Sequence, residues 1–106
     1  MSKHHHDADF YEFCKARWPR CILCNRRPVE QFHHFQLVGS PYYRGPAPRR
    51  SSTYNAAGVC NTCHDAMHDV VGERRVIEAF LGGYEELYRR QMRRLHEYLD
   101  YLRAAV

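Results

Sequence analysis

Two C-x-x-C pairs, Cys21/Cys24 and Cys60/Cys63, are separated by 35 residues in this chain. Each C-x-x-C segment forms a tight turn that aims two thiolates at one point, and two such turns complete a closed tetrahedral zinc site. A chain of 106 residues buries a limited core, so a metal cross-link adds needed stability. The spacing predicts one domain, residues 1–106, folded around a structural Zn²⁺ that binds all four cysteines.

Two other chemistries were weighed for these cysteines. CNTCH at residues 60–64 matches the C-x-x-C-H attachment signature of c-type haem, but covalent haem attachment normally needs export. Haem would also leave the CILC pair without a role. A thioredoxin-like redox role for CILC lacks the surrounding βαβ pattern. The fifth cysteine, Cys14, fits a buried apolar position.

The expected cellular compartment follows from two features that are missing from the sequence. MSKHHHDADF has no apolar stretch typical of a signal peptide, and no apolar run is long enough to span a membrane. We therefore expect a cytoplasmic protein, and cysteines in that compartment indicate metal binding more than disulfides. A hydrophobic content of 44% argues against disorder.

Local patterns predict a small α+β fold. A helix is expected over 9–18, ended by Trp18-Pro19, and a strand over 29–38. An irregular loop over 39–53 precedes a helix that begins near residue 61. C-terminal helices are expected over 73–104, interrupted at Gly82-Gly83. The last helix carries an apolar stripe that is expected to pack on the core or to form a homodimer interface; a nucleic-acid recognition helix is the third alternative. The stripe comprises Tyr84, Leu87, Tyr88, Met92, Leu95, Tyr98, Leu99 and Leu102.

The positive charge is concentrated between the cysteine pairs. The chain has a net charge of +4, and residues 26–60 hold five arginines against one glutamate, while the remainder is balanced. Arginine suits bidentate contacts to phosphate. A solvated basic loop would carry the same composition, so charge alone leaves a nucleic-acid partner and a plain surface loop open.

Histidines form the second group of candidate ligands. If residues 62–69 are helical, His64 and His68 lie on one face with the spacing needed to chelate one ion, and Cys63 faces another direction. They could equally be surface polar residues. Upstream, His33 and His34 are neighbours in the expected strand, so their side chains point to opposite faces. That split suggests one metal ligand and one general base.

Together, the pattern HH…N…C-x-x-C-H-x3-H resembles the HNH endonucleases of the ββα-metal superfamily, in the subgroup braced by a four-cysteine zinc. The match covers about residues 21–69. The Asn55-to-His64 spacing and the final H-x3-H are similar to colicin-type DNases, and the compact layout resembles small phage or prophage HNH proteins. The resemblance implies a β-hairpin and a helix that together clasp a divalent cation.

Residue roles follow from this resemblance. It implies that His34 is the general base that activates water, and that Asn55 holds the hairpin loop and orients His34. The catalytic cation, Mg²⁺, Mn²⁺, Ni²⁺ or Zn²⁺, would be bound by His33, His64 and His68. It would stabilise the phosphorane and the leaving 3′ oxygen.

The expected function is therefore metal-dependent hydrolysis of DNA phosphodiester bonds. The DNA backbone would meet the arginine loop, namely Arg44, Arg49 and Arg50. The alternative is a non-catalytic zinc module that binds nucleic acid or protein. Such a module needs the cysteines but has no use for the histidines and Asn55 together. An inactive relative would usually have lost one of these residues, and all are present.

Overall fold

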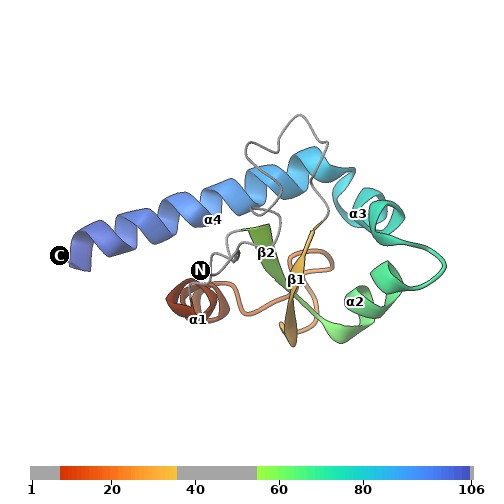
Figure 1. The fold of residues 1–106 in the computed structure, drawn as a ribbon, viewed down its shortest axis with the longest axis horizontal. Helices are drawn as coiled ribbons and strands as arrows, with labels where there is room; N and C mark the ends of the chain where they lie inside the picture. Colours follow the sequence, from red (N-terminus) through yellow and green to blue (C-terminus); the bar gives the residue numbers. More distant parts are fainter. Residues whose placement is uncertain (1–7, 36–54, 106) are drawn as a thin grey trace, which may run out of the picture.

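The computed structural model describes residues 8–35 and 55–105. Within these residues the chain forms a two-stranded antiparallel sheet and four helices, in the order α1-β1-β2-α2-α3-α4 (Figure 1). The predicted α+β class is confirmed. In the described part of the chain, no helix combines the length and the apolar character needed to cross a membrane.

Helix α1, Ala8–Arg17, lies close to the residues predicted for it. It stops short of Pro19, whose missing N–H cannot continue the helical ladder. Its inner side carries Phe10 and Cys14, which form a small core cluster with Tyr98 of the last helix. The N-terminal helix therefore packs against the C-terminal helix, and the two ends of the described chain are joined through this cluster.

The sheet pairs β1, Gln31–His34, with β2, Ala56–Val59. In its register Gln31 lies opposite Val59, and His34 lies opposite Ala56. All four residues of β2 are buried. One of them, Gly58, has no room for a side chain, because a Cβ there would lie 2.6 Å from a methyl carbon of Val29.

The strand predicted over 29–38 begins too early. Val29 donates its backbone N–H to the carbonyl of Pro19 at 2.9 Å, so it binds the segment that leads into the first cysteine pair. Regular pairing of β1 starts only at Gln31. The predicted residues 36–38 lie outside the described part of the chain.

Helix α2, Asn61–His68, begins where the sequence predicts. The backbone N–H of Asn61 donates to Glu30 Oε1 at 2.9 Å, and its side-chain amide donates to the other oxygen of that carboxylate at 3.1 Å. A carboxylate at a helix N-terminus satisfies unpaired N–H groups and complements the helix dipole. Glu30 thus fixes the start of α2 beside the sheet.

Helices α3, Glu73–Leu81, and α4, Tyr84–Ala105, follow as predicted, with a break at two glycines. Gly82 has φ 86°, the left-handed conformation that commonly ends a helix, and its N–H donates to Glu78 O at 3.0 Å. The turn brings the start of α4 back toward α3, and α4 then runs the length of the molecule (Figure 1).

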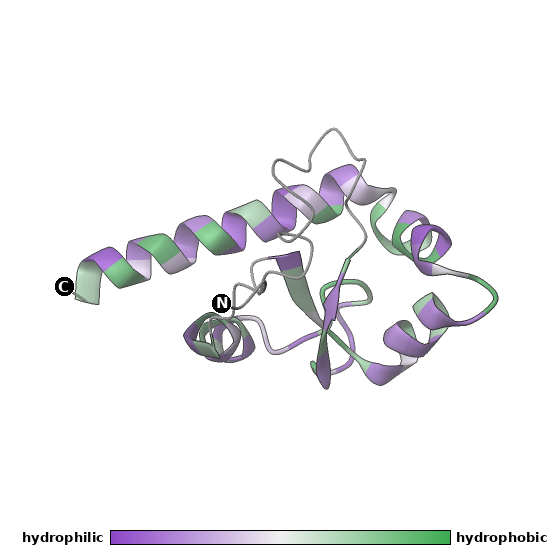
Figure 2. Cartoon of the chain, viewed as in Figure 1, coloured by the Kyte–Doolittle hydropathy of each residue, from purple (hydrophilic) through white to green (hydrophobic). Residues whose placement is uncertain are grey.

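Helix α4 alternates apolar and polar turns along its whole length (Figure 2). Its buried residues are Leu87, Gln91 and Tyr98. The Gln91 amide donates to the carbonyl of Ala56 at 2.9 Å, which ties α4 to β2. Leu99 remains 46% exposed. The stripe is therefore core in part, while the homodimer through this helix stays a prediction.

Candidate metal centres

The four paired cysteines come together inside the main core cluster. Their Sγ atoms all lie within 4.8 Å of one another, and Cys24 Sγ lies 3.9 Å from Cys60 Sγ. In a regular tetrahedron with Zn–S bonds of about 2.3 Å, the sulfurs lie about 3.8 Å apart. The cysteines are free thiols, three of them buried. This group could hold a metal ion, and its spacing fits tetrahedral coordination.

Short backbone turns place the first pair of sulfurs. Cys21 donates its N–H to Arg27 O at 2.8 Å, and Asn25 donates its N–H to Cys21 O at 2.9 Å. Asn25 adopts φ 54°, a conformation that asparagine tolerates better than most residues. The turn after CILC therefore folds back tightly enough to present Cys21 and Cys24 together.

The second pair sits at the start of α2. Cys60 precedes the helix and its Sγ accepts the N–H of Cys63 at 3.4 Å. The carbonyl of Cys60 accepts the N–H of His64 at 3.0 Å. The helix thus begins on a sulfur cap, which fixes Cys60 and Cys63 on its inner side.

The electrostatics of the sulfurs favour a bound cation. Burial raises the pKa of Cys63 and of Cys60 above the ordinary thiol range. Burial works to raise the pKa of Cys24, but hydrogen bonds from the backbone of Arg27 and Arg26 and from the side chains of Cys21 and Cys60 together outweigh it and lower that pKa to about 7. Four clustered thiolates are therefore stable only when a positive charge joins them, and this donor set fits a thiolate-binding metal.

A second cluster consists of three imidazoles. One ring nitrogen each from His33, His64 and His68 lies within 4.8 Å of the others. The Nε2 atoms of His64 and His68 are 3.1 Å apart. His33 is 8% exposed, whereas His68 is exposed, so the cluster is closed on the side of the sheet and open to solvent on the other. A three-ligand site with an open side is typical of catalytic metal sites.

His64 is suited to act as a neutral ligand. Burial lowers its pKa, and the positive charge that His68 and His33 would carry lowers it further. A metal binds the unprotonated imidazole, so the environment favours the form that can coordinate. The neighbouring Asp65 carboxylate acts in the opposite direction, as the weakest of these influences.

Helix α2 separates the two clusters. Cys63 and Met67 are buried on its inner side, while His64 and His68 lie on a different side toward His33. The structure therefore brings together the three histidines expected to bind one cation, and keeps them apart from the four cysteines. One eight-residue helix supplies ligands to both groups.

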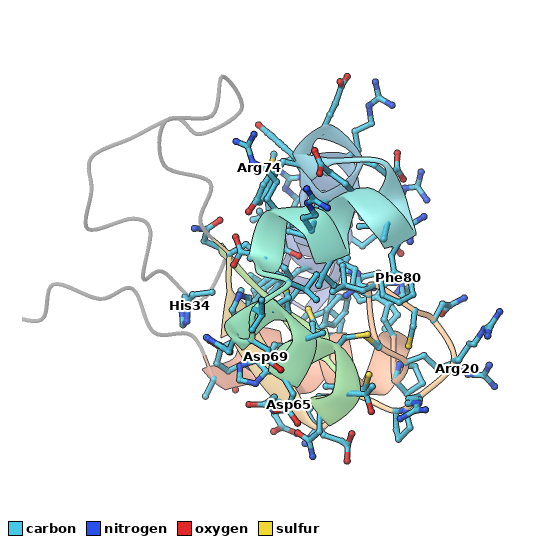
Figure 3. All side chains as sticks on the ribbon, turned by 90° about the vertical axis from the view of Figure 1, so that its right-hand side faces the viewer. Arg20, His34, Asp65, Asp69, Arg74 and Phe80 are labelled. Atoms are coloured by element: carbon cyan, nitrogen blue, oxygen red, sulfur yellow. The ribbon has the colours of Figure 1, made fainter. Side chains whose placement is uncertain are left out.

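The adjacent histidines of β1 have different surroundings. His33 is buried opposite Ala57 and belongs to the cluster, whereas His34 is exposed. Figure 3 shows the His34 side chain pointing away from the helices. The strand alternation expected for this pair is present, and His34 does not belong to the three-imidazole cluster.

Asn55 links the two strands at their open end. Its side-chain amide N–H donates to the backbone carbonyl of Phe35 at 3.4 Å, and its backbone carbonyl accepts the Phe35 N–H at 3.3 Å. Phe35 follows His34 directly in the chain. Asn55 thus contacts the backbone of the residue after His34, and its expected role in orienting His34 stays a prediction.

Two residues of the histidine site were missed by the sequence reasoning. Glu73 Oε1 lies 2.7 Å from His33 Nε2, and both side chains are nearly enclosed, 11% and 8% exposed. The Tyr84 hydroxyl donates to the other oxygen of Glu73. Burial raises the pKa of Tyr84 and the Glu73 contact raises it further, so the hydroxyl keeps its proton. A glutamate in a first helical turn has an ordinary explanation in the helix dipole, so nothing in the sequence pointed to the site.

The arginines predicted to contact DNA lie outside the described residues, namely Arg44, Arg49 and Arg50. Comparisons with protein-family models, with curated proteins and with solved structures found no match for this chain.

Proposed function

We propose that the protein is a metal-dependent DNA endonuclease of the HNH type, with a structural zinc on its four cysteines. One observation carries the proposal: three imidazoles converge on one point, and an exposed histidine adjoins one of them on the same strand. A zinc module without catalysis needs only the cysteine cluster. It gives no reason for an open three-histidine site beside His34.

The cysteine cluster supports zinc as the structural metal. The donor set is four sulfurs, the sulfur spacing fits tetrahedral geometry, and the group is closed within the core. Closed four-coordinate sites are structural, since they leave no position for a substrate. The catalytic role in this proposal belongs to the histidine cluster alone.

The reaction is hydrolysis of a DNA phosphodiester. His34 accepts a proton from water, whose oxygen attacks phosphorus as the bond from phosphorus to the 3′ oxygen breaks. A neutral imidazole can take this proton near physiological pH, which general-base catalysis requires. The exposure of His34 on β1 gives substrate and water access to it.

The three clustered histidines would hold the divalent cation. When bound, the cation supplies positive charge for the phosphate oxygens and the departing 3′ oxygen. Asn55 acts on the base rather than on the metal, since its hydrogen bonds to Phe35 hold the backbone next to His34. These bonds hold the end of the strand from which the side chain of His34 projects.

DNA is the proposed substrate because three of the five arginines in residues 26–60 lie in the segment that joins the two strands, which carries no acidic residue. In sequence, that segment begins just after His34 and ends at Asn55. Arg44, Arg49 and Arg50 fall within it and are proposed to contact phosphates.

The deciding experiment is nicking of supercoiled plasmid by purified protein. Mild chelation should abolish cleavage, and Mn²⁺, Mg²⁺ or Ni²⁺ should restore it. Added metal should not restore the cleavage that His34→Ala loses, about 10²–10⁴-fold, whereas His96→Ala, which changes an exposed histidine on α4, should cleave like the parent. No cleavage by the parent with any of these metals would favour the non-catalytic zinc module, whereas equal cleavage by parent and His34→Ala would remove His34 as the general base.

A further inference from the structure

The contact between Glu73 and His33 joins the histidine cluster to the C-terminal helices. It bridges 40 positions of sequence, from the first residue of α3 to the third residue of β1. Glu73 is not itself a member of the three-histidine group, so its contact is with one ligand rather than with the centre of the site. It therefore acts on the site through His33.

The chemistry of this pair fixes one feature of the imidazole. An ionised carboxylate can only accept hydrogen bonds, so the hydrogen between Glu73 and His33 is carried by Nε2. The other ring nitrogen, Nδ1, then keeps its lone pair for a cation. A carboxylate behind a metal-binding histidine also holds the ring in place and makes the ligand nitrogen more basic.

Glu73 is in turn held by the last helix. Tyr84, the first residue of α4, donates its hydroxyl hydrogen to Glu73 Oε2. Each carboxylate oxygen thus has a hydrogen-bond partner, one in β1 and one in α4. Farther along α4, Gln91 binds the backbone of β2, the strand paired with β1. The start of α4 is thereby fixed relative to His33.

We propose that Glu73 is a positioning residue for the ligand His33, and that Tyr84 holds Glu73 in place, so that α3 and α4 set the metal affinity of the histidine site. The inference rests on the proposed cation at this site. It gives the C-terminal helices, which lie outside the predicted metal core, a role in the chemistry. A competing account is that Glu73 only stabilises the N-terminus of α3 through the helix dipole.

The test is a calorimetric titration of the zinc-loaded full chain with Ni²⁺. Glu73→Gln keeps the shape of the side chain and removes its charge, and it should weaken Ni²⁺ binding by about 10–100-fold with zinc content unchanged. Tyr84→Phe should cause a smaller loss, about fivefold, the share of one hydrogen bond. The matched control is Glu78→Gln, which neutralises an exposed carboxylate on the same helix and should bind Ni²⁺ like the parent.

A second readout separates positioning from helix stabilisation. Nitrogen-15 NMR of the metal-free histidines should show His33 as the Nε2–H tautomer in the parent and as a mixture in Glu73→Gln. The dipole account predicts lower helix stability with the same tautomer and the same Ni²⁺ affinity, and that result would overturn the inference while leaving the nuclease proposal intact. If the parent takes up no Ni²⁺ beyond its zinc, the metal site fails, and the role of Glu73 fails with it.

Discussion

The Nε2 atoms of His64 and His68 lie 3.1 Å apart, one turn from each other on α2. Two protonated imidazoles at this distance would repel each other, so the pair is suited to share a cation as neutral ligands. His68→Ala should therefore weaken the second metal strongly while the zinc stays bound, and excess cation should partly restore cleavage. Metal analysis and calorimetry check this result, with His96→Ala as the control. Unchanged affinity in His68→Ala would remove this residue from the ligand set.

Cys63→Ser should unfold the domain. Structural zinc contributes about 10–16 kcal/mol of apparent binding free energy in small zinc-dependent peptides, which equals or exceeds the roughly 5–15 kcal/mol stability of a typical domain. Circular dichroism and zinc content are the measurements. Cys14→Ala is the control, because Cys14 lies in the separate cluster with Phe10 and Tyr98 and should keep the zinc. A normal melting curve for metal-free Cys63→Ser would contradict the structural role.

His34→Ala should lower cleavage by about 10²–10⁴, the usual share of a general base, without changing the binding of either metal. Activity of the parent should fall as the pH is lowered, because protonation removes the lone pair that accepts the proton from water. That acid limb should be absent from the residual activity of His34→Ala. If His34→Ala instead loses the second metal and His33→Ala keeps it, the two histidines have exchanged roles.

The arginine segment should bind DNA mainly through phosphates. Each lost phosphate contact lowers the slope of log affinity against log salt concentration by about 0.9 on duplex DNA. The triple alanine variant of Arg44, Arg49 and Arg50 should therefore show a clearly shallower slope in a salt titration. A charge-matched control removes three arginines of α4, namely Arg89, Arg93 and Arg103. Equal slopes for parent and loop variant would mean that this segment does not touch the DNA backbone.

Cys14 should be chemically inert in the folded protein. Burial raises its pKa to about 11, against a small opposing effect of Arg94, so the reactive thiolate is scarce at ordinary pH. Because the raised pKa favours the neutral thiol in the folded state, the free energy of unfolding should decrease as the pH rises above the ordinary thiol range. Iodoacetamide at pH 8 should modify Cys14 in denaturant and spare it in the native state. Rapid native labelling, read by mass spectrometry, would show that the α1–α4 cluster opens.

Most helix boundaries could be predicted because their signals are local. The two glycines at 82 and 83 stop one helix whatever surrounds them, and α2 starts directly after Cys60, the first cysteine of the second pair. The strand near residue 30 was predicted too long because its limit is set by a distant partner. The backbone N–H of Val29 is hydrogen-bonded to the carbonyl of Pro19, and the residue type of Val29 does not predict that contact.

In the candidate site, too, some residues could be predicted from local sequence, and others depend on contacts with distant parts of the chain. The spacing of His64 and His68 on a helix, and the alternation of His33 and His34 on a strand, are consequences of local periodicity. The Glu73 contact depends on how α3 packs against the sheet, 40 positions away in sequence. Gln91 is a similar case: it is polar, yet it is buried in the apolar stripe because β2 offers it a carbonyl.

The shortness of α2 has a consequence for the order in which the protein acquires its metals. Isolated helices of fewer than about 12–15 residues are marginal in water, and α2 has eight residues. We expect its helical conformation to depend on the cysteines Cys60 and Cys63 at its start. Only in that conformation do His64 and His68 lie one turn apart. We therefore expect sequential loading, in which zinc on the cysteines stabilises the helix first and the helix then brings His64 and His68 together for the proposed second cation. A weak chelator would remove the cation from the three histidines and leave zinc on the four cysteines. A chelator strong enough to remove the zinc would abolish both sites at once.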